Sequence, residues 1–456
     1  MKIDAALRPT DLRAAADQVL ALGADKAKLI ERSWDPRQGT PVFTINGRYA
    51  SRGWTEWTQG FQYGCAILAF DGTGDRSLLE LGRKHTVANM AAHVTHIGVH
   101  DHGFNNLSTY GNLRRLMREK RIAHDPWEMH FYDLAIKASA CTQAARWSTT
   151  AEGGGYVYSF NGPHSLFVDT MRTLRILGVA HQLGHVFQGE NDQKISLLGR
   201  LIQHAETTAK YIVWYGEGRD SYDIRGRTAH EAIFNRNDGR FRCPSSQQGF
   251  APFTTWTRGL AWAILGFAEE IEFLETLPAA DFTALGRKKA EVLTGFRRAA
   301  EATADFWIDH GTASDGIPYW DTGAPELHKL GDWQARAAEP FNDHEPVDSS
   351  AAAIAAQGLI RLGSALTGTA GKRYVQAGLH VSRTLFAEPY LSTAAKHQGL
   401  LLHQVYHRPN GWDHIPKGRK VPCGESALWG DYHLMELAVL VQRMAAKKPA
   451  YLTFFT

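Results

Sequence analysis

The spacing of apolar side chains predicts a chain built almost wholly from helices. Apolar residues recur every three or four positions, and no long run alternates between apolar and polar residues as a strand would. Residues 127–147 carry a one-sided stripe of Trp127, Phe131, Leu134, Ala138, Cys141 and Ala145. Twelve segments are predicted to be helical, at about 10–22, 57–70, 75–94, 104–119, 127–147, 169–182, 191–213, 256–275, 281–309, 348–366, 371–387 and 426–446.

The connections between these helices alternate between short, glycine-containing turns and long segments rich in aromatic and charged residues. Twelve helices with long connections on one side predict an all-α toroid, with six inner helices, six outer helices and a site at one mouth. The irregular segments 214–255 and 310–347 are interpreted as loops that build this site. No linker divides the chain, so we expect a single domain over residues 1–456.

Composition excludes several classes of partner. The chain has 50 Lys and Arg against 47 Asp and Glu, a net charge of +3 that gives no reason to expect nucleic acid. It has no apolar run of about 18 residues and no apolar core near the N-terminus, so neither a membrane span nor a signal peptide is expected. Four distant cysteines favour a reduced, cytoplasmic protein over a disulfide frame: Cys65, Cys141, Cys243 and Cys423.

Two aspartates at predicted helix starts are candidate catalytic residues. Asp169 follows Leu166, Phe167 and Val168, which indicates a segment that points inward. An aspartate in this position is ordinarily a helix cap, but a carboxylate among apolar side chains gains proton affinity and can act as a general acid. Asp101 could be a second carboxylate that faces the same cavity, or another cap between solvated histidines.

Polar and aromatic residues near a later helix could bind a sugar. Arg258 and Trp262 are four residues apart and so share a helix face. Arginine offers a fork for a carboxylate or for sugar hydroxyls, tryptophan offers a stacking wall, and Gln248 can both donate and accept hydrogen bonds. The alternative is an ordinary amphipathic helix with a surface arginine.

Histidines give weaker signals. His230 lies in the long loop 214–255, where a lone histidine usually faces solvent. His93 with His96, and His403 with His407, have the spacing of metal ligands, but neither pair has an obvious third ligand. We therefore expect no metal and no cofactor.

Five motifs, in order and compatibly spaced over about 55–440, resemble those of the unsaturated glucuronyl hydrolases, glycoside hydrolase family 88. No single motif carries the resemblance; together they are specific. They are Ser165-Leu166-Phe167-Val168-Asp169-Thr170-Met171, His100-Asp101-His102-Gly103-Phe104, Gln248-Gly249-Phe250 with Trp256-Thr257-Arg258-Gly259-Leu260-Ala261-Trp262, Pro346-Val347-Asp348-Ser349-Ser350-Ala351-Ala352-Ala353, and Gly430-Asp431-Tyr432.

The resemblance implies an (α/α)6 barrel and a cytoplasmic enzyme, monomeric or homodimeric, that acts on oligosaccharides cut by polysaccharide lyases. Such fragments end in a uronic acid with a C4–C5 double bond. Asp169 would be the general acid and base, and Asp101 its carboxylate neighbour. The residues implied to bind substrate are His230, Gln248, Arg258, Trp262, Trp57 and His100.

The chain departs from the family pattern at a few positions. Gln59 stands where the family usually has Asp, Gln247 where it has His, and Phe250 where it has Tyr, and about 327–341 is an extra stretch. Two other functions therefore stay open. One is direct hydrolysis of a saturated β-glucuronide, with Asp101 and Asp169 as an inverting pair or a nucleophile pair. The other is a non-catalytic sugar-binding toroid.

Overall fold

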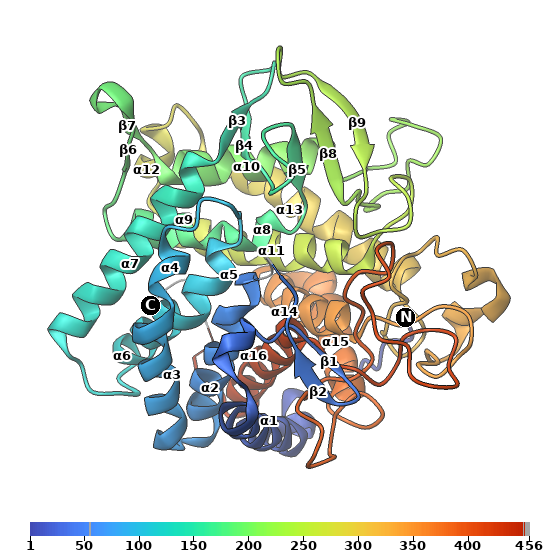
Figure 1. The fold of residues 1–456 in the computed structure, drawn as a ribbon. Helices are drawn as coiled ribbons and strands as arrows, with labels where there is room; N and C mark the ends of the chain where they lie inside the picture. Colours follow the sequence, from blue (N-terminus) through green and yellow to red (C-terminus); the bar gives the residue numbers. More distant parts are fainter. Residues whose placement is uncertain (54–55, 450, 452–456) are drawn as a thin grey trace.

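The computed structural model describes residues 1–53, 56–449 and 451. Its helices alternate along the chain between an outer and an inner layer (Figure 1). The outer helices are α1 (Arg13–Ser33), α3 (Arg76–Asn89), α7 (Pro126–Ala145), α10 (Leu197–Tyr211), α13 (Lys289–Phe306) and α15 (Gly368–Leu385). The inner segments are α2 (Gln59–Thr73), α5 to α6 (His102–Asn106, Leu107–Gly111, Asn112–Arg118), α8 with α9 (Thr170–Thr173, Arg175–Gln182), α11 (Thr257–Thr276), α14 (Ser349–Ala365) and α16 (Leu428–Ala445).

Each inner segment contacts the next, and α16 packs against α2, which closes the ring. The described part of the chain is thus an (α/α)6 barrel, as predicted. Each of the twelve predicted segments contains a helix, although α1 continues to Ser33 and the segment 104–119 is interrupted by a π-helical turn, Leu107–Gly111. Two further short helices, α4 (Ala91–Val94) and α12 (Ala279–Thr283), lie outside the two layers. Among the described residues, every helix is too short or too polar to cross a membrane.

The inner helices approach closely because small residues lie at their contacts. A Cβ atom on Gly103 of α5 would come within 2.1 Å of the Thr173 carbonyl oxygen at the end of α8. A Cβ atom on Gly60 of α2 would come within 2.3 Å of the Asn105 carbonyl oxygen in α5. Such distances leave no room for a side chain, so these glycines set the spacing of α2, α5 and α8.

The outer helix α7 shows the limit of the periodic pattern. Its apolar stripe was identified from the sequence, but Trp127 is 83% exposed, Leu134 66% and Phe131 43%. The buried face instead includes Tyr132 and Ile136. The pattern therefore predicts the helix correctly, while these three side chains face solvent.

Most of the short strands in the described chain lie in the upper part of Figure 1, whereas the hairpin of residues 43–50 lies lower in the view. An antiparallel sheet has the order β5 (Ser165–Phe167), β8 (Glu231–Phe234), β9 (Phe241–Ser245), and β3 (Trp147–Thr149) pairs with β4 (Gly155–Val157). Two more hairpins are β1 (Phe43–Ile45) with β2 (Arg48–Ala50), and β6 (Phe187–Gln188) with β7 (Lys194–Ile195). Strand β5 leads directly into α8, so the sheet fixes where Asp169 lies.

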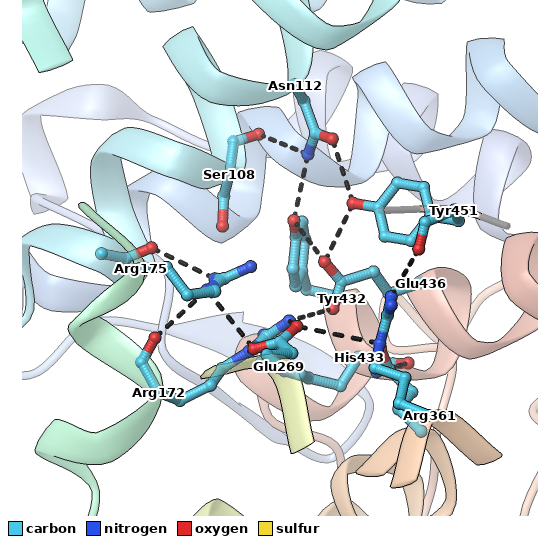
Figure 2. A network of polar contacts seen from close by, with 12 residues as sticks. Ser108, Asn112, Arg172, Arg175, Glu269, Arg361, Tyr432, His433, Glu436 and Tyr451 are labelled. Carbon is cyan, nitrogen blue, oxygen red and sulfur yellow. Dashed lines mark hydrogen bonds and ion pairs between the residues drawn. The ribbon is translucent and has the colours of Figure 1, made fainter. Parts of the chain in front are cut away.

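A buried network of charges joins four inner segments inside the ring (Figure 2). Arg172 of α8 donates to Glu269 of α11 at 3.0 Å and to Glu436 of α16 at 2.8 Å. Arg361 of α14 pairs with Glu272 of α11 at 3.0 Å. Removing one partner of such a buried pair leaves an uncompensated charge, which costs about 3–5 kcal/mol. The network therefore fixes the inner segments relative to one another.

Candidate active site

A cavity of about 280 Å³ contains most of the predicted site residues. Six of the eight candidates line it: Asp101, Asp169, Gln248, Arg258, Trp262 and Trp57. The other two, His100 and His230, are not among its lining residues and are only 1% and 2% exposed. The structure thus brings the motifs together in one place. Six of the candidates line the cavity, and the two histidines are buried behind that lining.

The two aspartates stand at helix starts but do not cap their helices with their side chains. Asp169 and Asp101 occupy the N-cap positions of α8 and α5, yet neither side chain makes a capping hydrogen bond. Asp348, at the start of α14, shows the ordinary arrangement: its carboxylate accepts from the backbone N–H groups of Ser350 and Ala351. Because Asp169 and Asp101 are released from this role, their carboxylates are available to the cavity that both line.

His100 shapes the charge of both carboxylates. Its Nε2 lies 3.4 Å from Asp169 Oδ1 and 4.0 Å from Asp101 Oδ1. Burial would raise the pKa of Asp169, but its neighbours, His100 foremost, outweigh burial and hold that pKa below its ordinary value. Burial raises the pKa of Asp101; His100 opposes this rise and Asp169 adds to it. The two carboxylates therefore differ in proton affinity, as a shared cavity requires.

The direction of this difference corrects the sequence analysis. Apolar neighbours led us to expect a raised proton affinity at Asp169, whereas the raised pKa belongs to Asp101. The cause is His100, whose effect the sequence pattern did not show. Asp169 can still exchange a proton, because a histidine whose own pKa is raised above 6.5 lies against it.

His230 holds the loop that carries Gln247 and Gln248. It is buried rather than facing solvent, and burial lowers its pKa to about 3, so the ring is neutral. Its Nδ1 accepts the backbone N–H of Gln247 at 2.9 Å. The Gln247 side chain donates to Asn161 at 2.7 Å, and Asn161 in turn donates to Glu231 at 3.0 Å. These bonds fix the loop against the β5–β8 sheet.

Arg258 is engaged inside the protein. Its Nη1 donates to Asp348 at 2.9 Å and to the carbonyl of Val405. Its Nη2 donates to Gln248 Oε1 at 3.1 Å and to the carbonyl of Tyr406 at 2.7 Å. The guanidinium group thus orients Gln248 and anchors the 405–406 segment, and its binding to a carboxylate or to sugar hydroxyls stays a prediction.

Aromatic rings form much of the cavity wall. Trp57 stacks on Trp429, with centroids 5.2 Å apart and planes at 25°. Trp262 packs against Phe104 and His433, with ring centroids 4.9 Å and 5.0 Å away. His433 belongs to the buried charge network (Figure 2), so its contact with Trp262 joins the wall to the network. Flat rings of this kind suit the face of a sugar.

One part of the wall was missed by the sequence analysis. The connection between α15 and α16 supplies Tyr406, His407, Asn410 and Trp412 to the cavity. Asp413 accepts the backbone N–H groups of Tyr406 and His407, which closes this segment into a loop. The signal was present, because the predicted helices 371–387 and 426–446 leave a connection far longer than the usual one. The loop 310–347, in contrast, contributes no lining residue; within it, Asp321 accepts the N–H of Phe250 at 2.8 Å.

The departures from the family pattern lie at different depths. Gln59 is not among the lining residues, and its side chain contacts His93 at 2.6 Å and Tyr63 at 3.2 Å. Phe250 is 49% exposed and outside the lining, whereas Gln247 is part of it. No residue of the extra stretch 327–341 lines the cavity. Within the described residues, no group of three or more His, Cys, Asp or Glu side chains is placed to hold a metal ion.

Comparison with known proteins agrees with the motifs. The unsaturated glucuronyl hydrolase of Formosa agariphila is 26% identical over 396 residues, which is 86% of this chain and 81% of that protein. The unsaturated chondroitin disaccharide hydrolase of Streptococcus pyogenes serotype M1 is 24% identical over 87% of this chain and 84% of its own length. No family model matches the chain.

Solved structures show the same fold. A crystal structure of an unsaturated glucuronyl hydrolase specific for heparin superposes with a TM-score of 0.70 at 18% identity, covering 95% of this chain and 98% of that one. The enzyme from Bacillus sp. GL1 superposes with a TM-score of 0.68 at 21% identity, covering 94% and 96%. These relatives confirm the predicted resemblance, the predicted barrel and the prediction of a glycoside hydrolase. The chain is a homologue of the unsaturated glucuronyl hydrolases along most of its length, and it has their (α/α)6 barrel.

Proposed function

We propose that the protein removes a terminal 4,5-unsaturated uronic acid from oligosaccharides that polysaccharide lyases have cut. The relatives named above support this substrate class. The structural observation that carries it is the pair Asp169 and Asp101, both free of capping bonds and both lining one aromatic-walled cavity. Neither direct hydrolysis of saturated glucuronides nor a non-catalytic toroid has support among these relatives.

In the proposed reaction, Asp169 delivers a proton to C4 of the enol-ether double bond, and positive charge develops at C5 and the ring oxygen. Asp169, now ionised, takes a proton from water as the hydroxyl adds to C5. The resulting hemiketal opens and releases the remaining sugar. The substrate's own carboxylate favours the first step, because a nearby negative charge raises the proton affinity of Asp169. General acid–base catalysis of this kind contributes about 10²–10⁴ in rate.

The other lining residues would hold the sugar. Asp101 accepts hydrogen bonds from ring hydroxyls, and Gln248, fixed by Arg258, can both donate and accept. Trp57 and Trp262 supply stacking faces. The reaction needs no metal or cofactor, since each step is a proton transfer or an addition of water.

The direct test is replacement of Asp169 by Asn. We expect Asp169→Asn to lose turnover of unsaturated disaccharides by a factor of at least about 10² while it still binds them. The readout is the loss of ultraviolet absorbance of the double bond, with binding followed by tryptophan fluorescence. Asp125→Asn is the matched control, because Asp125 is an exposed cap of α7 and asparagine caps equally well.

Two results would overturn the proposal. One is an Asp169→Asn variant that keeps a large share of wild-type activity. The other is faster release of nitrophenol from a saturated β-glucuronide than hydration of any unsaturated disaccharide. We also propose that the enzyme acts in the cytoplasm, which its four unpaired cysteines support and which cell fractionation would test.

A further inference from the structure

His100 and Asp169 face each other across a buried contact. Nε2 of the imidazole lies 3.4 Å from Asp169 Oδ1. Within the described part of the chain, neither of these buried atoms makes a hydrogen bond, so the contact between them is an ion pair. A buried polar atom without a partner costs about 1–3 kcal/mol, so this contact is what stabilises both atoms.

The imidazole cannot turn away from the carboxylate. Phe160 lies nearly parallel to it, at 5.9 Å between centroids and 24° between planes, and Phe167 meets it edge-on at 5.7 Å and 90°. Phe167 belongs to β5, the strand that ends just before Asp169. The segment from Phe167 to Asp169 therefore positions both the carboxylate and an aromatic ring that packs against the His100 imidazole.

The charges around His100 favour its protonated form. Burial lowers the pKa of His100, but Asp101 and Asp169 together outweigh burial and raise it. Burial holds the pKa of His204 and of His230 at about 3, so these two rings are neutral. The remaining charged group that acts on His100 is Arg146, which donates to the backbone carbonyls of Ile97, Tyr158 and Ser159.

We propose that His100 is a positioning residue that stores the proton Asp169 delivers to the sugar and that fixes the Asp169 carboxylate in its delivering orientation. This inference rests on the proposed function of the site. The Nε2 proton passes to Asp169, and Asp169 passes a proton to C4. Water then gives its hydroxyl to C5 and its proton to Asp169, which returns one to His100. The cycle begins and ends with one proton on the pair.

Two variants separate proton storage from packing. His100→Gln keeps a hydrogen-bond donor near Asp169 but cannot hold a titrating proton. His100→Phe keeps the ring between Phe160 and Phe167 but leaves Asp169 Oδ1 without a partner. We expect kcat to fall about 10- to 100-fold in the Gln variant, the range for groups that act from behind a reacting residue, with little change in KM. In the Phe variant, kcat should fall further than in the Gln variant.

The pH–rate profile distinguishes proton storage from a structural role, because a purely structural role of His100 would leave the profile unchanged. In the wild type, the pair loses its proton only as the pH rises through the raised pKa of His100, which lies above 6.5. In His100→Gln no imidazole holds that proton, which then resides on a carboxyl group, Asp169 or Asp101, a type of group whose ordinary pKa lies well below that of an imidazole. The alkaline limb should therefore move to lower pH. An alkaline limb that stays in place would refute proton storage.

His102→Gln is the matched control. His102 is also a buried histidine on this segment, but its ring contacts Ser139 at 2.8 Å and the carbonyl of His96 at 3.0 Å instead of the carboxylates. The pH–rate profile of His102→Gln should keep its acid and alkaline limbs at the same pH as in the wild type. Thermal unfolding followed by circular dichroism establishes that each variant is folded at the assay temperature.

A second measurement does not depend on turnover. Nuclear magnetic resonance of labelled histidine should give a pKa above 6.5 for His100 in the wild type and a lower one in Asp169→Asn. If this coupling is seen and no unsaturated substrate is turned over, the proposed function fails while the proton pair stands. If turnover is seen and His100 does not titrate with Asp169, the inference about His100 fails alone.

Discussion

At the scale of single residues, the cavity depends on side chains that do not line it, and on lining side chains that hydrogen-bond to other lining residues. His230 fixes the backbone of Gln247, and Arg258 fixes the side chain of Gln248 while it pairs with Asp348. Groups of this kind act by keeping a lining residue within a few tenths of an ångström of its working position. Their replacement should therefore alter catalysis more than the fold.

Arg258→Lys tests this idea. Lysine keeps the charge that compensates buried Asp348, but one ammonium group cannot serve Asp348, Gln248 and the two backbone carbonyls at once. We expect kcat/KM to fall by about tenfold or more, with a smaller loss in the free energy of unfolding. Steady-state kinetics and urea unfolding are the measurements, and Arg37→Lys, at an exposed position, is the control. Unchanged kinetics would show that Gln248 needs no such support.

At the scale of elements, the sequence predicted which segments are helical better than which side of each is buried. Periodicity identified α7, but Trp127 and Leu134 face solvent. It did not show the short strands of two to five residues, because such strands carry little periodic pattern and β5 is held by β8, a segment far along the chain. Likewise, Asp169, Asp101 and Asp348 all precede helices, and only the tertiary structure separates two uncapped carboxylates from a cap.

Gly103→Ala tests how the elements set the site. Its added methyl group would lie 2.1 Å from the Thr173 carbonyl oxygen, so α5 must move away from α8 and carry Asp101 with it. We expect a loss of about 1–3 kcal/mol in the free energy of unfolding and a fall in kcat. Gly295→Ala in α13 is the control, because nothing lies within 4 Å of its Cβ position. There, alanine should be neutral or stabilising by up to about 1 kcal/mol. Equal behaviour of the two variants would contradict the close-contact argument.

At the scale of the whole molecule, the ring of inner helices is held by apolar packing and by the charge network in Figure 2. Tyr451 joins this network, since its hydroxyl lies 3.0 Å from both Asn112 and Glu436. The motif resemblance predicted the barrel, but the network could not be inferred, because its members look like ordinary helix residues in the sequence. Glu269 and Glu270 are adjacent, for example, and have opposite roles.

Glu270→Gln tests the second of these residues. Both carboxyl oxygens of Glu270 are buried without a hydrogen-bond partner among the described residues, and burial raises its pKa well above 4.5. The folded state thus keeps the group neutral while the unfolded state ionises, so stability falls as the pH rises above about 4.5, by up to about 1.4 kcal/mol per pH unit. Chemical unfolding at several pH values should find Glu270→Gln more stable than the wild type at pH 7 and similar near pH 4.

Glu269→Gln should change the free energy of unfolding in the opposite direction. Glu269 pairs with Arg172 at 3.0 Å, and its pKa lies below the ordinary value because this pairing outweighs burial. Its replacement should lower the free energy of unfolding at pH 7. If both variants shifted stability in the same direction, the distinction between a paired and an unpaired buried acid would be wrong.

The closure of the ring by α16 against α2 has a consequence for synthesis. The cavity draws on residues from Trp57 to Trp412, and its supporting ring is incomplete until α16 has left the ribosome. Until then, the nascent chain is an open arc whose inner helices expose apolar faces and unpaired charges. We expect such an arc to need protection by chaperones and to be inactive, because contacts between the two ends of a long chain form late.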